Sequence, residues 1–374
     1  MILAIDMIGT NLGSGTKTYN YNFCDSLNKF NFKDTVYIFI TKDYSKIISM
    51  DYNKNVKYIV KPNFLNYILL RIFWMQFILP FELKLLKVHQ LFSPMNIGPV
   101  FLKLFNIKFS LALHSNLPWV YFSKMPGNFI RNLLTKFIME ISVKVCDKLI
   151  VDSEFAKNEI VQLLNLNKNK IYPVYLGVDK KYLSEGNDSF IKNFDYKDYF
   201  VSVLSCVRYH NIINLLKGFK LLKLEHNINL KFIIVLQILD KNYYEDIKKF
   251  VFKNFKNNEV IFLHDLESKY LVNLYKNAKF YIFSSYCEVF GLTSLEAMSQ
   301  GCPVLVSNRS ALPEINSNAA DYFNPDDENE IKDVMNKILN DSVHREEILQ
   351  KANKYFRKFD WNKTVNETMR VLFN

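Results

Sequence analysis

The chain has 374 residues, more than one hydrophobic core usually supports, so its length predicts two domains. Hydrophobic residues make up 49% and charged residues 23%, a balance that excludes a largely disordered protein. The formal charge of +11 favours an anionic partner, although Lys- and Asn-rich loops spread that charge along the whole chain. The five cysteines form no CxxC pair and have no histidines nearby at metal spacing, so we expect free thiols in a reducing compartment.

The order of elements predicts an α/β fold. Short apolar runs alternate with longer amphipathic segments, which is typical of parallel sheets covered by helices on both faces. The first residues read as a buried strand and not as a signal peptide, because Asp6 follows at once and no basic region precedes it. A first series of strands is predicted near Ile2–Ile5, Val36–Thr41, Lys57–Val60, Lys108–Leu113, Leu149–Asp152 and Ile171–Tyr175. A second series is predicted near Phe200–Cys206, Lys231–Leu236, Val260–Leu263, Phe280–Phe283, Pro303–Val306 and Asp321–Phe323.

A glycine-rich loop, Gly9–Thr16, follows the first predicted strand and opens a helix. Backbone N–H groups at such a helix start can hold a phosphate, so Gly13 and Gly15 are candidate phosphate-binding residues. A lone glycine loop is common, and this motif identifies no site by itself.

The most apolar stretch of the chain runs from Phe64 to Leu86. Polar residues and a proline interrupt it well short of the roughly 20 apolar residues that a membrane span requires. Two interpretations remain open. The stretch is either a half-buried helix of the first domain, or an amphipathic helix that lies on a bilayer with Arg71 and Lys84 among its aromatic residues.

The polar stretch from Gly177 to Asp198 separates the two series of strands and is the predicted linker. We therefore predict an N-terminal domain over residues 1–178 and a C-terminal domain over residues 179–360. A last helix over about residues 361–374, capped by Asp360 or Asn362, is expected to pack back on the first domain.

The most informative segment is Ser284–Met298. A predicted strand ends before it, a loop carries Glu288 and Gly291, and a helix starts near Leu292. Amides at that helix start can hold a diphosphate, and Glu296, one turn further on, can accept both hydroxyls of a ribose. Gly291 allows the backbone to approach a ligand where a Cβ would clash.

The spacing of Glu288 and Glu296 resembles the E-x7-E signature of retaining glycosyltransferases with the GT-B fold, specifically glycosyltransferase family 4 (group 1). Nearly the whole chain takes part in the resemblance, through Gly9–Thr16, Leu149–Phe155, Tyr175–Asp179, Glu296–Val304, Ser310–Ile315 and Ala320–Pro325. The resemblance implies two Rossmann-like doubly wound domains that face each other across a cleft.

The resemblance also implies roles for single residues. Glu288 would face the donor sugar and the reacting centre, and Glu296 would bind the ribose. Gly13 and Gly15 would lie near the donor diphosphate. The remaining donor contacts would come from the start of the helix, at Phe290, Gly291, Leu292 and Thr293.

The sequence departs from the family at three places, one of them at Gln237, where the family usually has a glycine. His114 ends a strand where many relatives carry a His-Asp pair, but Ser115 follows it here, so only His114 is retained as a catalytic candidate. After the first strand of the second domain, relatives usually carry an Arg and a Lys that neutralise the leaving diphosphate. This chain has Ser205 and His210 at those places, with Arg208 between them, so we expect an altered phosphate site.

The expected function is the transfer of a sugar, with retention of configuration, from a nucleotide diphosphate sugar to a glycan or lipid-linked glycan in bacterial surface polysaccharide synthesis. We expect no metal, no other cofactor and no nucleic acid as partner. The expected location is the cytoplasm, with peripheral contact to an anionic membrane. The turn at Asp326-Asp327 is interpreted as a helix cap and not as a metal site.

Three alternatives stay open. An epimerase or hydrolase of sugar nucleotides on the same fold would consume donor without an acceptor. A catalytically inactive scaffold would explain the departures at Ser115 and Ser205. A nucleic-acid binder is suggested by charge alone, without a recognised motif.

Overall fold

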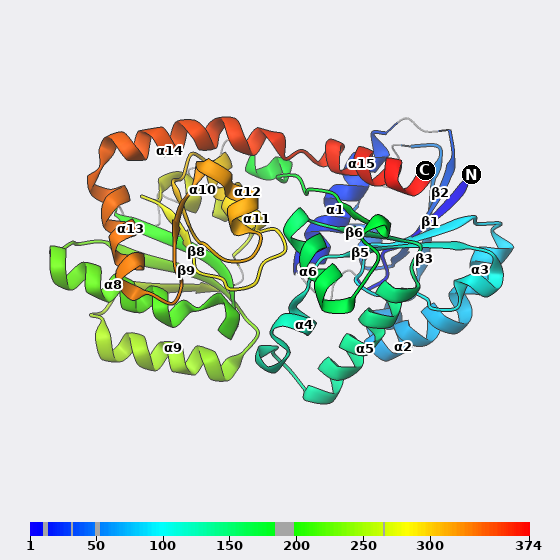
Figure 1. Cartoon of the computed structure of the whole chain (residues 1–374), viewed down its shortest axis with the longest axis horizontal. Helices are drawn as coiled ribbons and strands as arrows, with labels where there is room; N and C mark the ends of the chain where they lie inside the picture. The colour runs from blue at the N-terminus through cyan, green and yellow to red at the C-terminus, as the bar shows by residue number, and fades with distance from the viewer. Residues whose placement is uncertain (10–13, 31–32, 49–52, 184–197, 265) are drawn as a thin grey trace. The chain divides into compact units, whose positions relative to one another are not determined.

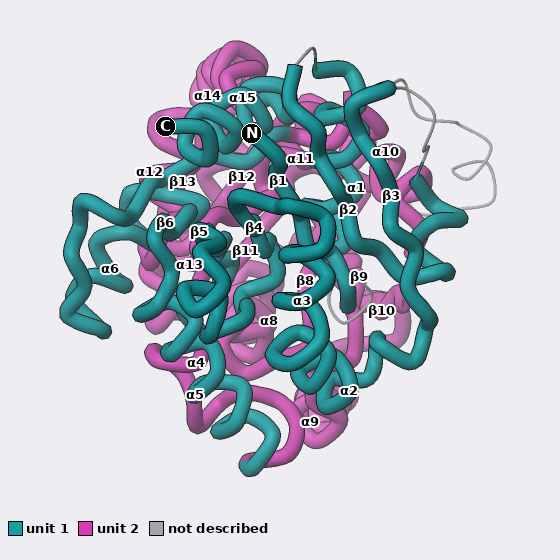
Figure 2. The backbone as a smooth tube through the Cα atoms, turned by 90° about the vertical axis from the view of Figure 1, so that its right-hand side faces the viewer, with its two compact units in different colours: residues 1–116, 130–177, 360–374 teal, residues 117–129, 178–359 magenta. Residues whose placement is uncertain are grey.

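The computed structural model describes residues 1–9, 14–30, 33–48, 53–183, 198–264 and 266–374. The chain divides into two compact units, which Figure 2 shows in two colours. Unit 1 comprises residues 1–116, 130–177 and 360–374, and unit 2 comprises residues 117–129 and 178–359. The predicted linker residues 184–197 lie outside the described residues.

Unit 1 is built on a parallel sheet that, in the described residues, has seven strands in the order β3-β2-β1-β4-β5-β6-β7. The strands are β1 (Ile2–Asp6), β2 (Thr35–Thr41), β3 (Val56–Lys61), β4 (Gln90–Ser93), β5 (Lys108–Leu113), β6 (Lys148–Val151) and β7 (Ile171–Pro173). The six predicted strands of the first series are confirmed, whereas β4 was missed. The order reverses direction between β1 and β4, which is where open α/β sheets bind ligands.

Helices cover both faces of this sheet (Figure 1). The α-helices are α1 (Ser14–Asn28), α2 (Ile68–Phe73), α3 (Leu79–Leu85), α5 (Phe129–Val145), α6 (Glu154–Leu164) and α15 (Trp361–Phe373). A π-helical turn, Trp74–Ile78, joins α2 to α3.

Helix α15 completes unit 1 from the far end of the sequence. Asp360 caps it by accepting from the amides of Asn362 and Lys363, so the expected cap is confirmed. Trp361 is buried with its ring 5.5 Å from that of Tyr19 on α1.

Unit 2 repeats the same architecture. Its parallel sheet, as far as the structure describes it, has six strands in the order β10-β9-β8-β11-β12-β13. They are β8 (Tyr199–Cys206), β9 (Lys231–Ile238), β10 (Val260–His264), β11 (Tyr281–Phe283), β12 (Val304–Ser307) and β13 (Asp321–Phe323), so all six predicted strands of the second series are confirmed. Its direction reverses between β8 and β11.

The α-helices of unit 2 are α4 (Leu117–Val120), α8 (Ile212–His226), α9 (Lys241–Asn254), α10 (Ser268–Asn277), α11 (Leu292–Ser299), α12 (Leu312–Asn316), α13 (Glu328–Asn340) and α14 (Ser342–Tyr355). Asp327 accepts hydrogen bonds from the amides of Asn329 and Glu330 at the start of α13. The interpretation of this turn as a helix cap is confirmed.

The apolar stretch Phe64–Leu86 forms α2, the π-turn and α3, and it exposes much of its apolar surface. No helix in the described ranges is long and apolar enough to cross a membrane. Arg71, which the bilayer interpretation would place at the surface, is buried. Its side chain is 2% exposed and its guanidinium lies 3.9 Å from Asp6, because a buried charge needs an opposite charge beside it.

Candidate functional site

The candidate site of unit 2 lies at the carboxyl ends of β8 and β11, the neighbouring strands between which the sheet changes direction. A single turn, Arg208–His210, follows β8, and the loop that carries Glu288 follows β11. Parallel strands present their carboxyl ends at one edge, so residues 78 positions apart in sequence (288 − 210) meet there.

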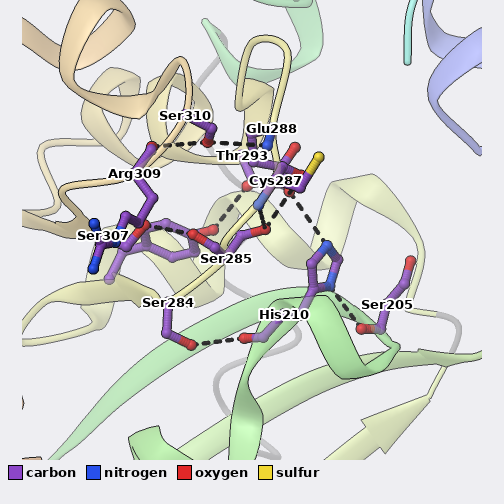
Figure 3. A network of polar contacts seen from close by, with 11 residues as sticks. Ser205, His210, Ser284, Ser285, Cys287, Glu288, Thr293, Ser307, Arg309 and Ser310 are labelled. Carbon is purple, nitrogen blue, oxygen red and sulfur yellow. Dashed lines mark hydrogen bonds and ion pairs between the residues drawn. The ribbon is translucent and has the colours of Figure 1, made fainter. Parts of the chain in front are cut away.

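His210 and Glu288 form an ion pair at this edge (Figure 3). The Nε2 atom of His210 lies 3.3 Å from Oε1 of Glu288. Its Nδ1 atom lies 2.7 Å from the carbonyl oxygen of Ser205. The side chain of His210 is 9% exposed and that of Glu288 is 21% exposed, so the carboxylate faces solvent while the imidazole is held underneath.

Backbone hydrogen bonds fix both partners of this pair. The Ser284 hydroxyl donates to the His210 carbonyl at 2.7 Å. The Glu288 amide donates to the Ser310 hydroxyl at 3.0 Å, and the Ala311 amide donates to the Glu288 carbonyl at 3.1 Å. The segment after β12, which resembles the family, therefore positions the loop of Glu288.

Gly291 begins helix α11 with a φ of +98°, which only glycine adopts readily. A Cβ at this position would lie 2.7 Å from Cδ2 of Leu312. The glycine is thus required by the backbone turn and by its packing against Leu312, whereas the sequence suggested approach to a ligand.

The other predicted residues at the start of α11 divide between surface and core. Leu292 and Thr293 are half-buried, and the Thr293 hydroxyl hydrogen-bonds that of Tyr281 at 2.7 Å. Phe290 is buried, with its ring 5.7 Å from that of Phe359. Any contribution of Phe290 to ligand binding therefore comes from its backbone.

Glu296 lies one turn into α11 and is 8% exposed. Burial raises the pKa of Glu296 to about 7, against an opposing attraction from Lys181. The Tyr275 hydroxyl donates to Glu296 at 3.5 Å, and Tyr182 also hydrogen-bonds this carboxyl group. A buried carboxyl with phenol donors and a nearby lysine is suited to accept hydrogen bonds from the hydroxyl groups of a ligand.

Arg208 lies apart from Glu288. Its guanidinium lies 3.6 Å from Asp240 and 3.3 Å from Asp246, and it stacks over the ring of Tyr243 at 5.1 Å. The structure thus brings His210, and not Arg208, to the carboxylate of Glu288.

In unit 1, His114 follows β5 and meets Asp152, which follows β6. Its Nδ1 atom lies 2.9 Å and 3.0 Å from the two carboxylate oxygens of Asp152. The Nε2 atom is buried and has no hydrogen-bond partner among the residues that the structure describes. The carboxylate therefore fixes a proton on Nδ1 and leaves Nε2 available for a ligand.

His114 thus has a carboxylate partner, Asp152, although Ser115 and not an aspartate follows it in the sequence. Sequence order hides this pair, since the two residues are 38 positions apart, and only the pairing of β5 with β6 brings them together. Lys181 and Tyr182, which lie near Glu296, were also missed. They belong to the segment that follows the predicted first domain, far from Glu296 in sequence.

The glycine loop of unit 1 is described in part. Gly13 lies outside the described residues. Gly15 lies in the first turn of α1, and a Cβ added there would meet no atom within 4 Å. Among the described residues, therefore, no neighbouring atom requires glycine at this position.

Two family models match successive parts of the chain. The model described as Glycosyltransferase Family 4 matches residues 13–182, and the model described as Glycosyl transferases group 1 matches residues 185–355.

Named relatives point the same way. The O-antigen chain mannosyltransferase RfbU of Salmonella typhimurium is 28% identical over 255 residues, which cover 68% of this chain and 66% of RfbU. The serotype-specific mannosyltransferase WbdA of Escherichia coli is 25% identical over 226 residues, which cover 59% of this chain and 28% of WbdA. The matched region is therefore less than two thirds of either relative.

Solved structures share the fold of the whole chain. Sucrose-phosphate synthase from Thermosynechococcus elongatus superimposes with a TM-score of 0.77 at 15% identity, covering 100% of this chain and 98% of the synthase. Anabaena Alr3699/HepE in complex with UDP and glucose superimposes with a TM-score of 0.73 at 14% identity, covering 100% and 98%. With two Rossmann-like α/β units and two family models that succeed each other along its length, this chain belongs to the group 1, family 4 glycosyltransferases with the GT-B fold.

Proposed function

We propose that this chain is a retaining glycosyltransferase that moves a hexose from a nucleotide diphosphate sugar to a glycan or lipid-linked glycan of a bacterial surface polysaccharide. The observation that carries the proposal is the placement of Glu288 and Glu296 around the start of α11, at the reversal point of the unit 2 sheet. Mannose is the first candidate sugar, since RfbU and WbdA are both mannosyltransferases by name.

Each residue of the site has a proposed part in the transfer. Glu296 accepts the ribose hydroxyls, and the amides that begin α11 bind the diphosphate. His210 supplies positive charge to the departing phosphate, as a preorganised cation does in other active sites. His114, held by Asp152, is the proposed sugar-contacting residue of unit 1.

We assign retention of the anomeric configuration to attack by the acceptor on the face of the sugar from which the diphosphate departs. The bond between the anomeric carbon and the phosphate oxygen breaks, and the acceptor oxygen bonds to the same face of that carbon. The acceptor proton passes to the departing phosphate oxygen. Glu288 stabilises the oxocarbenium-like sugar and is not assigned as a nucleophile. No metal or other cofactor is assigned a part.

A binding screen tests this proposal. The purified chain is titrated with a panel of nucleotide diphosphate sugars and followed by nuclear magnetic resonance, with Glu296→Ala as the comparison. We expect one sugar nucleotide to bind and the variant to lose roughly tenfold to a hundredfold in affinity, as for a hydrogen bond to a charged group. Absence of binding across the panel contradicts the proposal and favours an inactive scaffold.

Donor turnover separates transfer from the related reactions. Consumption of the donor without an acceptor identifies an epimerase or a hydrolase. Dependence on an added glycan acceptor identifies a transferase, and the anomeric configuration of the product then tests retention.

We also propose that unit 1 contacts an anionic membrane, where a lipid-linked acceptor would lie. The apolar face is defined as the exposed large hydrophobic residues of the α2–α3 segment, namely Phe64, Tyr67, Leu69, Leu70, Phe73, Phe77, Ile78, Phe81 and Leu85. Single exposed hydrophobic residues are ordinary, but a run of this size marks an interaction surface. Helix α5 of the same unit also exposes Ile130, Leu133, Leu134 and Phe137.

Positive charge borders this apolar face. Lys84 and Lys87 are exposed, and the Lys84 ammonium lies 5.9 Å from the centre of the Phe105 ring. The nearby Glu82 is neutralised by Lys61 at 2.7 Å. Exposed aromatic residues with lysines beside them suit anionic lipid headgroups.

Vesicle binding tests the membrane proposal. Lys84→Glu with Lys87→Glu, and separately Phe73→Ser with Phe77→Ser, should each reduce sedimentation with phosphatidylglycerol vesicles. The matched controls are Lys249→Glu with Lys253→Glu and Phe252→Ser, on the exposed surface of α9 in unit 2. Equal binding by test and control variants contradicts the assignment to unit 1.

A further inference from the structure

Both ring nitrogens of His210 lie beside oxygen atoms. A backbone carbonyl can only accept, and an ionised carboxylate can only accept. The ring of His210 lies between the Ser205 carbonyl, 2.7 Å from Nδ1, and the Glu288 carboxylate, 3.3 Å from Nε2. Both contacts are satisfied together when both ring nitrogens carry a proton.

The groups around His210 add no second charge that would replace it. The rings of Tyr209 and Phe283 stand edge-on to the imidazole, with centroids 4.7 Å and 5.3 Å away. Burial and the nearby Glu288 raise the pKa of Tyr209, so its phenol is neutral. Arg208, on the same turn, pairs with Asp240 and Asp246.

The backbone of His210 is fixed while its Nε2 partner is exchangeable. Ser284 holds its carbonyl, and the next residue, Asn211, has a left-handed φ of 54° that ends the turn. The Glu288 contact is longer, at 3.3 Å, and its carboxylate is the more exposed partner. A competing anion can therefore take Nε2–H without moving the fold.

We propose that His210 exchanges its partner when the donor binds: its protonated Nε2 leaves Glu288 and donates to the diphosphate, which frees Glu288 for the sugar. The inference rests on the proposed function and deepens it. A lysine would carry its charge at every physiological pH, but histidine gains or loses charge between about pH 5 and pH 8. Diphosphate binding by this chain is therefore proton-dependent.

Affinity measured against pH tests the exchange. The dissociation constants of UDP and GDP are measured by calorimetry from about pH 6 to about pH 8.5 for wild type, His210→Lys and His210→Gln. The titration of Glu296 is common to all three proteins, so their differences isolate position 210. Relative to His210→Lys, wild type should weaken by about tenfold as pH rises, the size expected for losing a charged hydrogen bond. His210→Gln should bind weakly at low pH as well, and the same pH dependence in wild type and His210→Lys would overturn the proposal.

A second experiment observes the imidazole ring of His210 in the protein without any ligand. In protein labelled with ¹⁵N at histidine, the His210 ring should show two protonated nitrogens, and Glu288→Gln should change their chemical shifts. A neutral ring paired with a protonated Glu288 would overturn the proposal whether or not a nucleotide binds. Failure of UDP and GDP to bind at every pH would instead count against the proposed function.

Discussion

The two histidines at the carboxyl ends of the two sheets are held in opposite ways. His114 in unit 1 gives one nitrogen to Asp152 and keeps Nε2 without a partner among the described residues. His210 in unit 2 has an acceptor at each nitrogen. The same side chain on the same kind of sheet edge thus contacts a carboxylate through Nδ1 at His114 and through Nε2 at His210.

The difference lies in the carboxylate that each neighbouring strand supplies. Asp152, at the end of β6, contacts Nδ1 of His114. The loop after β11 instead places Glu288 beside Nε2 of His210. The first arrangement fixes the orientation of the His114 ring. The second couples a histidine to a residue with a proposed role of its own, so a change at either should alter both.

Replacing Glu288 should have the largest effect. Glu288→Gln removes the charge that stabilises the sugar cation, so turnover should fall by about 10²- to 10³-fold, as when one transition-state contact is deleted. UDP or GDP affinity should change much less than turnover, since Glu296 and α11 are unchanged and only the partner of His210 is altered. Steady-state rates and calorimetry check this, and a loss of affinity as large as the loss of turnover would contradict a main role at the sugar.

Replacing Glu296 should reveal a conflict between stability and function. The protonated form of Glu296 stabilises the folded protein. This contribution is fully present below 4.5, the pKa of Glu296 in the unfolded chain, and is lost as pH rises through about 7, its pKa in the folded chain. Glu296→Gln avoids this loss, which is on the order of 3 kcal/mol. The ligand-free variant should therefore melt close to wild type at pH 4.5 but above it at pH 8. A pH-independent difference in melting temperature contradicts the raised pKa.

Replacing Gly291 tests the start of α11 without touching a charge. Gly291→Ala should cost about 2 kcal/mol, from the left-handed backbone and from the contact with Leu312. Gly301→Ala is the matched control, because Gly301 has a φ of +69° but no atom within 4 Å of the added Cβ. Thermal unfolding should show the larger loss at position 291, and equal losses would mean that Leu312 moves freely.

Replacing Asp152 should have the smallest effect on rate. Asp152→Asn weakens a charge-assisted hydrogen bond to His114 by about 1 kcal/mol, roughly fivefold in kcat/KM. Steady-state kinetics check this, and an unchanged kcat/KM would contradict a positioning role for Asp152.

Strand periodicity was sufficient to predict most of the fold. The missed strand, β4, contains Gln90 and Ser93, and both side chains are buried. The Gln90 amide donates to the Ser110 hydroxyl and the Ser93 hydroxyl donates to the Ile97 carbonyl, so burial carries little cost. Polar residues satisfied by distant partners cannot be recognised from local patterning.

The residues of the candidate site could be predicted from the sequence, but the contacts between them could not. Glu288, Glu296 and His210 were identified from spacing and resemblance, and their roles remain predictions. The pairing of His114 with Asp152 depends on strand register, and the burial of Arg71 depends on Asp6, which lies on another element. Both contacts join residues far apart in sequence, where a single sequence carries no signal.

The route of the chain through unit 1 has a consequence for biosynthesis. Residues 360–374 supply its last helix, and Trp361, Val365 and Leu372 are buried there. The ribosome makes these residues after all of unit 2, so the unit whose synthesis begins first is the unit that completes its core last. Until α15 is synthesised, the surface of α1 that receives Trp361 stays uncovered, and a chain that stops short of α15 would leave that surface permanently open.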